Sequence, residues 1–514
     1  MKIGSGGSPN RPRRLAPPRA KIQQPWPNTA ILAIAVASFA VGTIVRVLAA
    51  QNDLWFDEVW TLQLLRERVH SFGDVFTNVK HSNNHHLCSL WMFLVGQNAS
   101  SLVYRLPSVL ASIGTIVLAG LIGLRQSRLE GSIAMILTSW SYLLIHFGTD
   151  ARGYSLVIFF ALLAWYALQQ FEERRSWIWI IVFWSAVILG FLAHLEFAIC
   201  FAGLVAWALW RFARYRSRWR QAVLDLFALL TVPIVLLPAF YFVAIRGMEV
   251  AGGDTYRLWP LLIKTASYTL GGPGSGAVAR IIALMAVAAL CVALIYLMFE
   301  RDDRWIFYAV VIVAPLALIA IQRPEQLYVR YLVISVAMSL LLLSSAYAAT
   351  LRRGFAGLAI GLALLALYVT GNAANTSNLL RFGRGQYLAA LIFMETHSND
   401  KRVLITSTSS ANLGNGLLVN YYKSYLDRPD DLEYVDQATL KEDYARTNGF
   451  SLGAEWLILH SYDLTRQPPG VTDEYGNSYQ LVSIYRGSDL SGSNWLLYHN
   501  LNRGPMAPQS PLSR

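Results

Sequence analysis

Apolar runs of about 20 residues recur between residues 29 and 372 of this chain, separated by short polar connections. An α-helix of about 20 residues spans the roughly 30 Å of hydrocarbon in a bilayer. The predicted fold class is therefore a polytopic α-helical membrane protein. The pattern predicts about eleven membrane-spanning helices, at 29–50, 103–124, 130–148, 153–171, 177–193, 196–213, 222–245, 277–299, 305–322, 329–349 and 354–372.

Basic residues occupy every second connection between these helices, and six more precede the first helix. Because Lys and Arg gather in cytoplasmic loops, this alternation predicts a cytoplasmic N-terminus. Eleven crossings then predict an extracytoplasmic C-terminus. The connections concerned contain Arg125 and Arg128, Arg174 and Arg175, the run from Arg211 to Arg220, Arg301 and Arg304, and Arg352 and Arg353.

The chain divides into a spanning domain at 28–372 and a different segment at 373–503. In the latter, short β-rich runs such as 402–406 alternate with helical patterns such as 386–396, which predicts a small extracytoplasmic α/β domain. Within the spanning domain, 51–102 is too long for a turn and too mixed to cross the bilayer.

We expect 51–102 to form an outer loop with interfacial helices at 59–68 and 87–95. The basic cytoplasmic tail at 1–27 and the end at 504–514 are predicted to be disordered.

The composition supports a membrane protein, with 55% hydrophobic and 14% charged residues and a mean hydropathy of +0.39. The net charge of +12 is attributed to cytoplasmic loops rather than to nucleic-acid binding. Three cysteines without a C-x-x-C pair argue against a disulfide framework and a zinc site. Without a Walker A or a placed G-x-G-x-x-G motif, no cofactor is expected.

Asp57 and Glu58 lie just after the first apolar run, in Trp55-Phe56-Asp57-Glu58-Val59-Trp60. A carboxylate inside hydrocarbon costs about 2.5–3.5 kcal/mol, so the pair is expected to face water, a cavity or a polar ligand. One carboxylate can serve as a general base that takes a proton from an attacking hydroxyl. Alternatively, both acids stabilise the N-terminus of a helix that begins near Trp55.

A second polar cluster reads His81-Ser82-Asn83-Asn84-His85-His86. We predict that His85 and His86 contact the substrate. The alternative is a polar loop in which Asn84 is the N-cap of a helix that starts at Leu87. The cluster does not complete a closed ligand set, so a divalent metal is not supported.

Arginines at two outer helix ends depart from the positive-inside pattern. Arg152, followed by Tyr154, and Arg330, followed by Tyr331, are predicted to bind an anionic group of the substrate. The alternatives are snorkelling of Arg152 to lipid headgroups and an ion pair of Arg330 with Glu325.

His194 and Glu196 lie at another outer turn, where a lone histidine is more often a packing residue. Acids, arginines and histidines on one outer face suit an anionic, lipid-linked substrate such as a polyprenyl phosphate.

Four motifs in this order resemble the GT-C glycosyltransferases. They are Asp57-Glu58 after the first helix, His85 or His86 at the head of an interfacial helix, Arg105-Leu106-Pro107-Ser108, and Ala151-Arg152-Gly153-Tyr154. The branch they resemble contains the protein O-mannosyltransferases, the lipid A aminoarabinose transferases and the lipopolysaccharide galacturonosyltransferases. The resemblance covers about 29–350, and the segment after 373 matches only in position.

This resemblance implies inverting transfer of a sugar from a polyprenyl-phosphate donor to an envelope acceptor, at the outer face of a bacterial inner (plasma) membrane. Asp57 would be the base, with Glu58 in support, and Arg152 and Arg330 would hold the donor phosphate. The family often has His-Pro-Pro where this chain has Asn84-His85-His86, and His85 is the favoured match.

Two other functions remain open from the sequence. A transporter or flippase of lipid-linked sugars would also carry polar groups in the membrane, although such proteins tend to show repeated halves. A polymerase or ligase of surface polysaccharide would carry its main active loop later in the chain. The acceptor is left open among lipid A or core sugars, polysaccharide, protein and cell-wall glycan, and the sugar is not identified.

Overall fold

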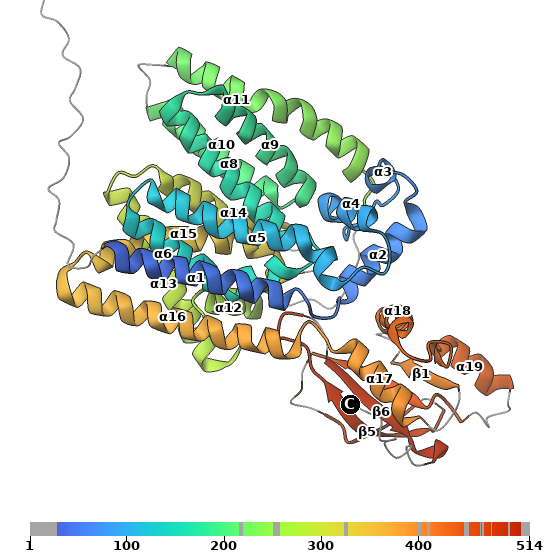
Figure 1. The fold of residues 1–514 in the computed structure, drawn as a ribbon. Helices are drawn as coiled ribbons and strands as arrows, with labels where there is room; N and C mark the ends of the chain where they lie inside the picture. The colour runs from blue at the N-terminus through green and yellow to red at the C-terminus, as the bar shows by residue number, and fades with distance from the viewer. Residues whose placement is uncertain are drawn as a thin grey trace, which may run out of the picture.

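The computed structural model describes residues 28–214, 219–249, 257–322, 327–398, 402–408, 412–446, 452–462, 464, 467–473, 475–491 and 494–504. These residues form a bundle of long helices that ends, on one side, in a group of short helices and a C-terminal sheet domain (Figure 1). The predicted tails before residue 28 and after Gly504 lie outside the described residues.

Each predicted span coincides with a helix or a pair of helices. The helices are α1 (Asn28–Ala49), α5 (Ser101–Leu124), α6 (Arg128–Trp140) with α7 (Tyr142–His146) and the 3-10 turn η1 (Phe147–Thr149), α8 (Tyr154–Arg174), α9 (Trp177–Ala193), α10 (Phe197–Arg214), α11 (Trp219–Phe240) with the π-helical η3 (Tyr241–Ile245), α13 (Gly276–Phe299), α14 (Arg304–Gln322), η4 (Val329–Leu332) with α15 (Val333–Leu351), and α16 (Gly354–Phe382).

The number of crossings remains a prediction. By length and composition, eight helices of the described chain can cross a membrane, or nine if a bent pair counts as one span. The α9 helix and the apolar part of α10 belong to a shorter class. The chain is therefore a multi-pass membrane protein whose count of eleven spans is not established by helix length.

The predicted helix at 130–148 is broken rather than continuous. The axis bends by 60° between α6 and α7. Ser141 lies at the break, where its Oγ accepts a hydrogen bond from Leu144 N, as an N-cap serine does. The side chain of Asn372 accepts another from Tyr142 N at 2.8 Å. The 3-10 turn η1 leads into the loop whose Ala151 N–H donates to Glu58 Oε1.

Three short helices make up the outer loop: α2 (Phe56–Arg68), α3 (Asp74–Thr77) and α4 (His86–Val95). The two predicted interfacial helices correspond to α2 and α4, whereas α3 was not predicted. The alternative that Asn84 caps α4 is wrong. His85 is the N-cap residue, and the Asn84 side chain instead donates to the carbonyls of Val75 and Val79, both at 2.8 Å.

The predicted outer connection at 246–276 also contains a helix, α12 (Leu258–Thr269). With 12 residues it is too short to cross a bilayer. Leu261 and Tyr268 on this helix are buried in the bundle core. The α16 helix also runs ten residues beyond the predicted boundary at 372, to Phe382.

The C-terminal part is an α/β domain, as predicted. Its sheet has the order β2-β1-β3-β6-β5-β4, with parallel pairing of β1 to β2 and β3 and antiparallel pairing elsewhere. The strands are β1 (Val403–Ser407), β2 (Leu432–Tyr434), β3 (Trp456–Ser461), β4 (Gly470–Thr472), β5 (Ser478–Tyr485) and β6 (Asn494–Asn500), and the helices are α17 (Tyr387–His397), α18 (Asn412–Tyr422) and α19 (Gln437–Arg446).

The outer loop and the C-terminal domain share one hydrophobic core. Leu62 and Leu65 of α2 belong to the same buried cluster as Tyr387, Val419 and Trp456 of the domain. Burial of apolar surface contributes roughly 25 cal/mol per Å², so this cluster holds the domain against the loop. The helical bundle has a separate core.

Candidate active site

Asp57 and Glu58 lie in the first turn of α2, as expected from the alternative that both acids stabilise the N-terminus of a helix. Trp55 is the N-cap residue, and its backbone N–H donates to Glu58 Oε2 at 3.0 Å. In a capping box, the side chain at the third helical position accepts a hydrogen bond from the N-cap N–H, and Glu58 makes this contact. Asp57 and Glu58 project differently, however, because Glu58 is fully buried while the Asp57 side chain is 13% exposed.

Glu58 forms a buried ion pair with Arg105 of α5. Arg105 Nε lies 2.8 Å from Oε1 and Nη2 lies 2.5 Å from Oε2, so the pair is bidentate. Oε1 also accepts from Ala151 N at 2.6 Å. Burial by itself raises the pKa of Glu58, but the charge and hydrogen bonds of Arg105 lower it below its usual value. Glu58 is therefore held as a carboxylate.

Arg105 also fixes the chain that leads into α2. Its remaining N–H groups donate to the carbonyls of Ala50, Asn52 and Asp53 at 3.1, 2.6 and 2.9 Å. All five donors of the guanidinium are thus used, the full capacity of the group. The sequence marked Arg105 only as part of a motif, and its partners are separated from it by about 50 residues.

Asp57 meets both predicted arginines at one oxygen. Arg330 Nη1 lies 2.9 Å and Arg152 Nη1 lies 3.3 Å from Asp57 Oδ2. Asp57 belongs to the outer loop, Arg152 lies just before α8, and Arg330 lies in η4, just before α15. One carboxylate and two guanidinium groups leave a net charge of +1 at this point, which suits an anionic ligand.

Aromatic rings surround the two arginines. Trp55 lies 6.0 Å from the guanidinium carbon of each, and Tyr154 lies 5.6 Å from that of Arg152. Arg152 Nη2 also donates to the Tyr154 hydroxyl at 3.3 Å, and Nη1 donates to Asn83 Oδ1. The Nε of Arg152 has no hydrogen-bond partner within the described chain.

Arg330 is packed in the same way by tyrosines. Its guanidinium carbon lies 4.1 Å from the ring centre of Tyr328 and 5.8 Å from that of Tyr331. Its Nε is also without a hydrogen-bond partner among the described residues. The predicted alternative partner, Glu325, lies outside those residues. Cation–π contacts orient a guanidinium while leaving N–H groups for a ligand.

The two adjacent histidines have different environments. His85 stacks on His194 at 4.8 Å and meets the Tyr154 ring at 5.3 Å, next to the arginines. His86 stacks instead on Phe76, and the edge of Phe240 packs against it. In the described chain, no hydrogen bond or ion pair joins His86 to Asp57 or to the two arginines. The structure thus brings His85, but not His86, to Arg152 and Arg330.

Burial keeps these histidines neutral. Desolvation and the neighbouring Arg152 place the pKa of His85 well below its usual value, and desolvation lowers that of His86 to about 4. Glu196, beside His194, has both carboxylate oxygens without hydrogen bonds in the described part.

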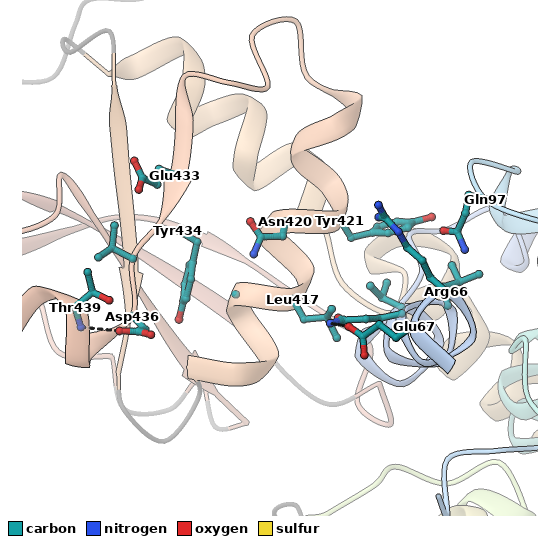
Figure 2. Close-up of a pocket in the computed structure, with 15 residues that line it drawn as sticks. Arg66, Glu67, Gln97, Leu417, Asn420, Tyr421, Glu433, Tyr434, Asp436 and Thr439 are labelled. Carbon is teal, nitrogen blue, oxygen red and sulfur yellow. Dashed lines mark hydrogen bonds between the residues drawn. The ribbon is translucent and has the colours of Figure 1, made fainter. Parts of the chain in front are cut away.

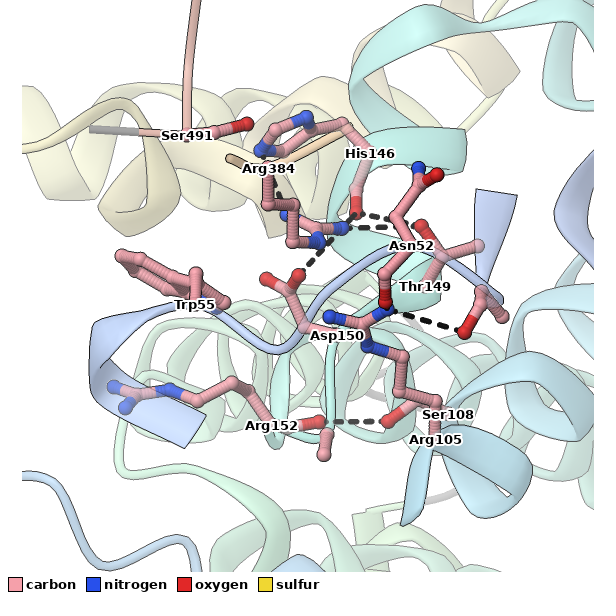
Figure 3. Close-up of polar contacts among 12 residues, drawn as sticks. Asn52, Trp55, Arg105, Ser108, His146, Thr149, Asp150, Arg152, Arg384 and Ser491 are labelled. Carbon is pink, nitrogen blue, oxygen red and sulfur yellow. Dashed lines mark hydrogen bonds and ion pairs between the residues drawn. The ribbon is translucent and has the colours of Figure 1, made fainter. Parts of the chain in front are cut away.

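A supporting ion pair behind the acid pair was not predicted. Arg384, two residues after α16, lies 2.5 Å from Asp150 Oδ1 and also contacts His146 and Thr149 (Figure 3). Burial raises the pKa of Asp150 to about 6, against the lowering effect of Arg384. Asp150 precedes Ala151, whose N–H donates to Glu58. Arg384 therefore stabilises the segment that holds Glu58 in place.

A metal ligand set is not found in the described part of the chain, where no three His, Cys, Asp or Glu side chains gather suitably. The groups gathered at the site are one partly exposed carboxylate, two arginines with spare donors, a neutral histidine and tyrosine hydroxyls.

This helical bundle with an outer loop and a C-terminal domain is a GT-C-like fold, and the resemblance predicted from the sequence is confirmed at the level of the fold. It is similar to the crystal structure of apo ArnT, a lipid A aminoarabinose transferase from Cupriavidus metallidurans. The TM-score is 0.52 with 13% identity, over 93% of this chain and 100% of that one.

Two further solved structures resemble this chain. ArnT from Cupriavidus metallidurans bound to undecaprenyl phosphate gives a TM-score of 0.50 at 12% identity, over 92% of this chain and 99% of that one. The oligosaccharyltransferase AglB from Archaeoglobus fulgidus, with an inhibitory peptide and a dolichol-phosphate, gives 0.47 at 11% identity, over 84% and 69%. No family model and no curated protein sequence matches the chain.

Proposed function

We propose that this protein is an integral membrane glycosyltransferase that moves a sugar from a polyprenyl-phosphate donor to an envelope acceptor. The observation that carries the proposal is the meeting of Arg152 and Arg330 at Asp57 Oδ2, at 3.3 and 2.9 Å, within a GT-C-like fold. A structure of similar fold, ArnT, is bound to undecaprenyl phosphate, which supports this class of donor.

The proposed reaction is a single displacement. The oxygen of an acceptor hydroxyl forms a bond to the anomeric carbon while the bond from that carbon to the phosphate oxygen breaks. The electron pair leaves with polyprenyl phosphate, and the proton of the hydroxyl passes to Asp57. One displacement inverts the anomeric configuration and needs no covalent sugar–enzyme intermediate.

The arginines act on the leaving group. The donor is a phosphodiester with one negative charge, and the released monoester carries more charge on its oxygens. Fixed guanidinium groups stabilise that developing charge without reorganising. When the donor phosphate takes the N–H groups of Arg152 and Arg330, Asp57 Oδ2 becomes free to accept a hydrogen bond from the acceptor hydroxyl.

The location belongs to the same proposal. The bundle's predicted cytoplasmic connections are one helix length from the site: Arg105 on α5 and Arg125, the residue that follows this helix, are separated by about 30 Å at 1.5 Å per residue. We place Asp57 at the extracytoplasmic face of a bacterial inner membrane. The acceptor class includes lipid A or core sugars, polysaccharide and protein.

The test is turnover by the purified chain with a polyprenyl-phosphate sugar, measured as released polyprenyl phosphate. Asp57→Asn keeps the shape but removes the base, so turnover should fall by about 10²-fold or more while donor binding persists. Asp74→Asn on α3, a partly exposed acid of the same loop whose side chain accepts hydrogen bonds from backbone N–H groups, is the matched control and should keep full activity. An Asp57→Asn protein with wild-type turnover would exclude Asp57 as the base.

A further inference from the structure

A cavity in the described residues lies beside α2, and Asp57 is not among the residues that line it. It has a volume of about 840 Å³, within the usual range of about 300–1,000 Å³ for ligand sites. Helix α2 forms one wall, and α18, β2 and the start of α19 form the other. Figure 2 shows Arg66 and Glu67 of α2 on one side and Asn420, Tyr434 and Asp436 of the C-terminal domain on the other.

The polar groups of this cavity include side-chain amides with unused hydrogen-bonding capacity. Gln97 and Asn420 line it and are exposed. Neither side chain makes a hydrogen bond within the described chain. Each amide offers two N–H donors and one carbonyl acceptor on a planar group. Such a group can bridge neighbouring hydroxyls of a ligand.

The charges of the cavity disfavour an anion. Glu67, Glu433 and Asp436 line it against a single cation, Arg66. Glu433 is paired with Arg402, so Glu67 and Asp436 remain against Arg66. A phosphate or carboxylate ligand would therefore meet a net negative wall. A neutral or amine-bearing ligand rich in hydroxyl groups would not.

Aromatic rings complete the lining. Tyr421 and Tyr434 both contribute to the wall formed by the C-terminal domain, and Leu62 and Leu417 add apolar surface. Aromatic rings, planar amides and carboxylates together suit the two kinds of surface of a sugar ring, which are its C–H faces and its hydroxyl edges. We infer that this cavity binds a saccharide that is neutral or carries an amino group.

The cavity and Asp57 lie along the same helix. Val59, Leu62 and Arg66 lie on the same helix, α2, whose first turn contains Asp57. The rise of 1.5 Å per residue puts these positions within about 15 Å of Asp57 along the helix. On the proposed function, the saccharide held here is part of the acceptor, and its reacting hydroxyl reaches towards the first turn of α2.

The test measures saccharide binding without any donor or turnover. Saturation-transfer difference NMR on the full chain in detergent would use chitotriose as a neutral probe, chitosan trimer as an amine-bearing probe and tri-galacturonate as an anionic probe. We expect signals from one or both of the first two and none from the third. The Asn420→Ala, Gln97→Ala double variant should weaken binding by about 10-fold or more, because it removes several hydrogen bonds.

Two variants make the test specific. Gln480→Ala changes an exposed side chain on β5, away from β2 in the order of the sheet, and should bind the probe as the wild type does. Asn420→Lys, which introduces a large cation into the cavity, should abolish binding of chitosan trimer. Melting temperatures confirm that each variant folds.

The outcomes separate this inference from the proposed function. Asp57→Asn should bind the saccharide normally although it turns over poorly. Absence of binding by both chitotriose and chitosan trimer, preferential binding of tri-galacturonate, or unchanged binding by the double variant would overturn the saccharide site while leaving the turnover result intact. Saccharide binding without any transferase activity would overturn the proposed function and leave the binding site.

Discussion

Arg152 and Arg330 share one carboxylate partner, so their contributions to ligand binding can be tested individually. If both hold the donor phosphate, Arg→Ala at either should weaken donor binding by about 10- to 100-fold, the value of a charged hydrogen bond of about 1.5–3 kcal/mol. Arg→Lys should restore binding only partly, because an ammonium group replaces a planar fork. Equilibrium binding of undecaprenyl phosphate, which contains the phosphate and lipid of the proposed donor, measures the effect.

A matched control for these arginines is Arg381→Ala. Arg381 is exposed near the end of α16, and its guanidinium packs on the ring of Phe382. Donor affinity should not change in this variant. Wild-type affinity in both Arg152→Ala and Arg330→Ala would leave these residues as supports of Asp57.

Glu58 contributes more to the stability of the fold than the sequence predicts. From the sequence, Glu58→Gln is expected to be a mild change, because Glu58 only supports Asp57. The structure buries it completely against Arg105. Breaking a buried ion pair leaves an uncompensated charge and costs about 3–5 kcal/mol.

Glu58→Gln should therefore lower the melting temperature of the purified protein strongly, whereas Glu67→Gln on the exposed face of α2 should leave it nearly unchanged. Equal melting temperatures would show that Arg105 finds other acceptors.

At the scale of elements, the site depends on a close approach between α8 and α9. Gly153 precedes α8, and a Cβ at this position would lie 1.9 Å from the carbonyl oxygen of Ala193 and 2.9 Å from His85 Nδ1. The glycine in Arg152-Gly153-Tyr154 is thus required by the packing of two helix ends and a histidine.

Gly153→Ala should destabilise the protein by at least about 1–3 kcal/mol, the usual cost of overpacking, and should displace His85. Gly73→Ala is the control, since its φ of −65° suits any residue and its nearest neighbour would be 3.8 Å away. Thermal unfolding of the two variants compares them directly. Equal stability would mean that the helix ends separate without cost.

The bend between α6 and α7 is the second feature decided between elements. Ser141 and Asn372 together satisfy the backbone groups freed at the break. The apolar run at 130–148 predicted one straight helix, because hydrophobic periodicity does not register a single hydrogen-bonding partner 230 residues away.

At the scale of the whole molecule, the alternating basic loops predict which end of the bundle faces the cytoplasm. Reporter tags at Arg216 and Arg353 should be cytoplasmic, and a tag after Arg503 should be extracytoplasmic. The added helix α12 does not change this, because it is too short to cross. Accessibility of the tags to protease in spheroplasts measures the topology. A cytoplasmic tag after Arg503 would contradict the outer-face site.

The position of the C-terminal domain is also a property of the whole molecule. The Tyr422 hydroxyl donates to the carbonyl of Leu54 at 2.8 Å, and Leu388 N donates to Asp53 Oδ2 at 3.0 Å. The domain therefore contacts the residues just before Asp57. The contact of the domain with this segment could not be predicted from the sequence, because the partners are more than 300 residues apart along the chain.

The sequence by itself determined the elements whose signals are local. Long apolar runs predicted the spanning helices, short β-rich runs predicted an α/β domain, and charge at helix ends singled out Asp57, Arg152 and Arg330. These features follow from hydrophobic transfer and from the cost of placing charge in hydrocarbon, and neither depends on distant partners.

Only the tertiary structure decided which polar groups meet. It separated Asp57 from Glu58, paired Glu58 with Arg105, brought His85 but not His86 to the arginines, and placed Arg384 beneath the loop. The physical reason is that a buried charge must find partners, and those partners come from segments that fold together rather than from neighbours in sequence.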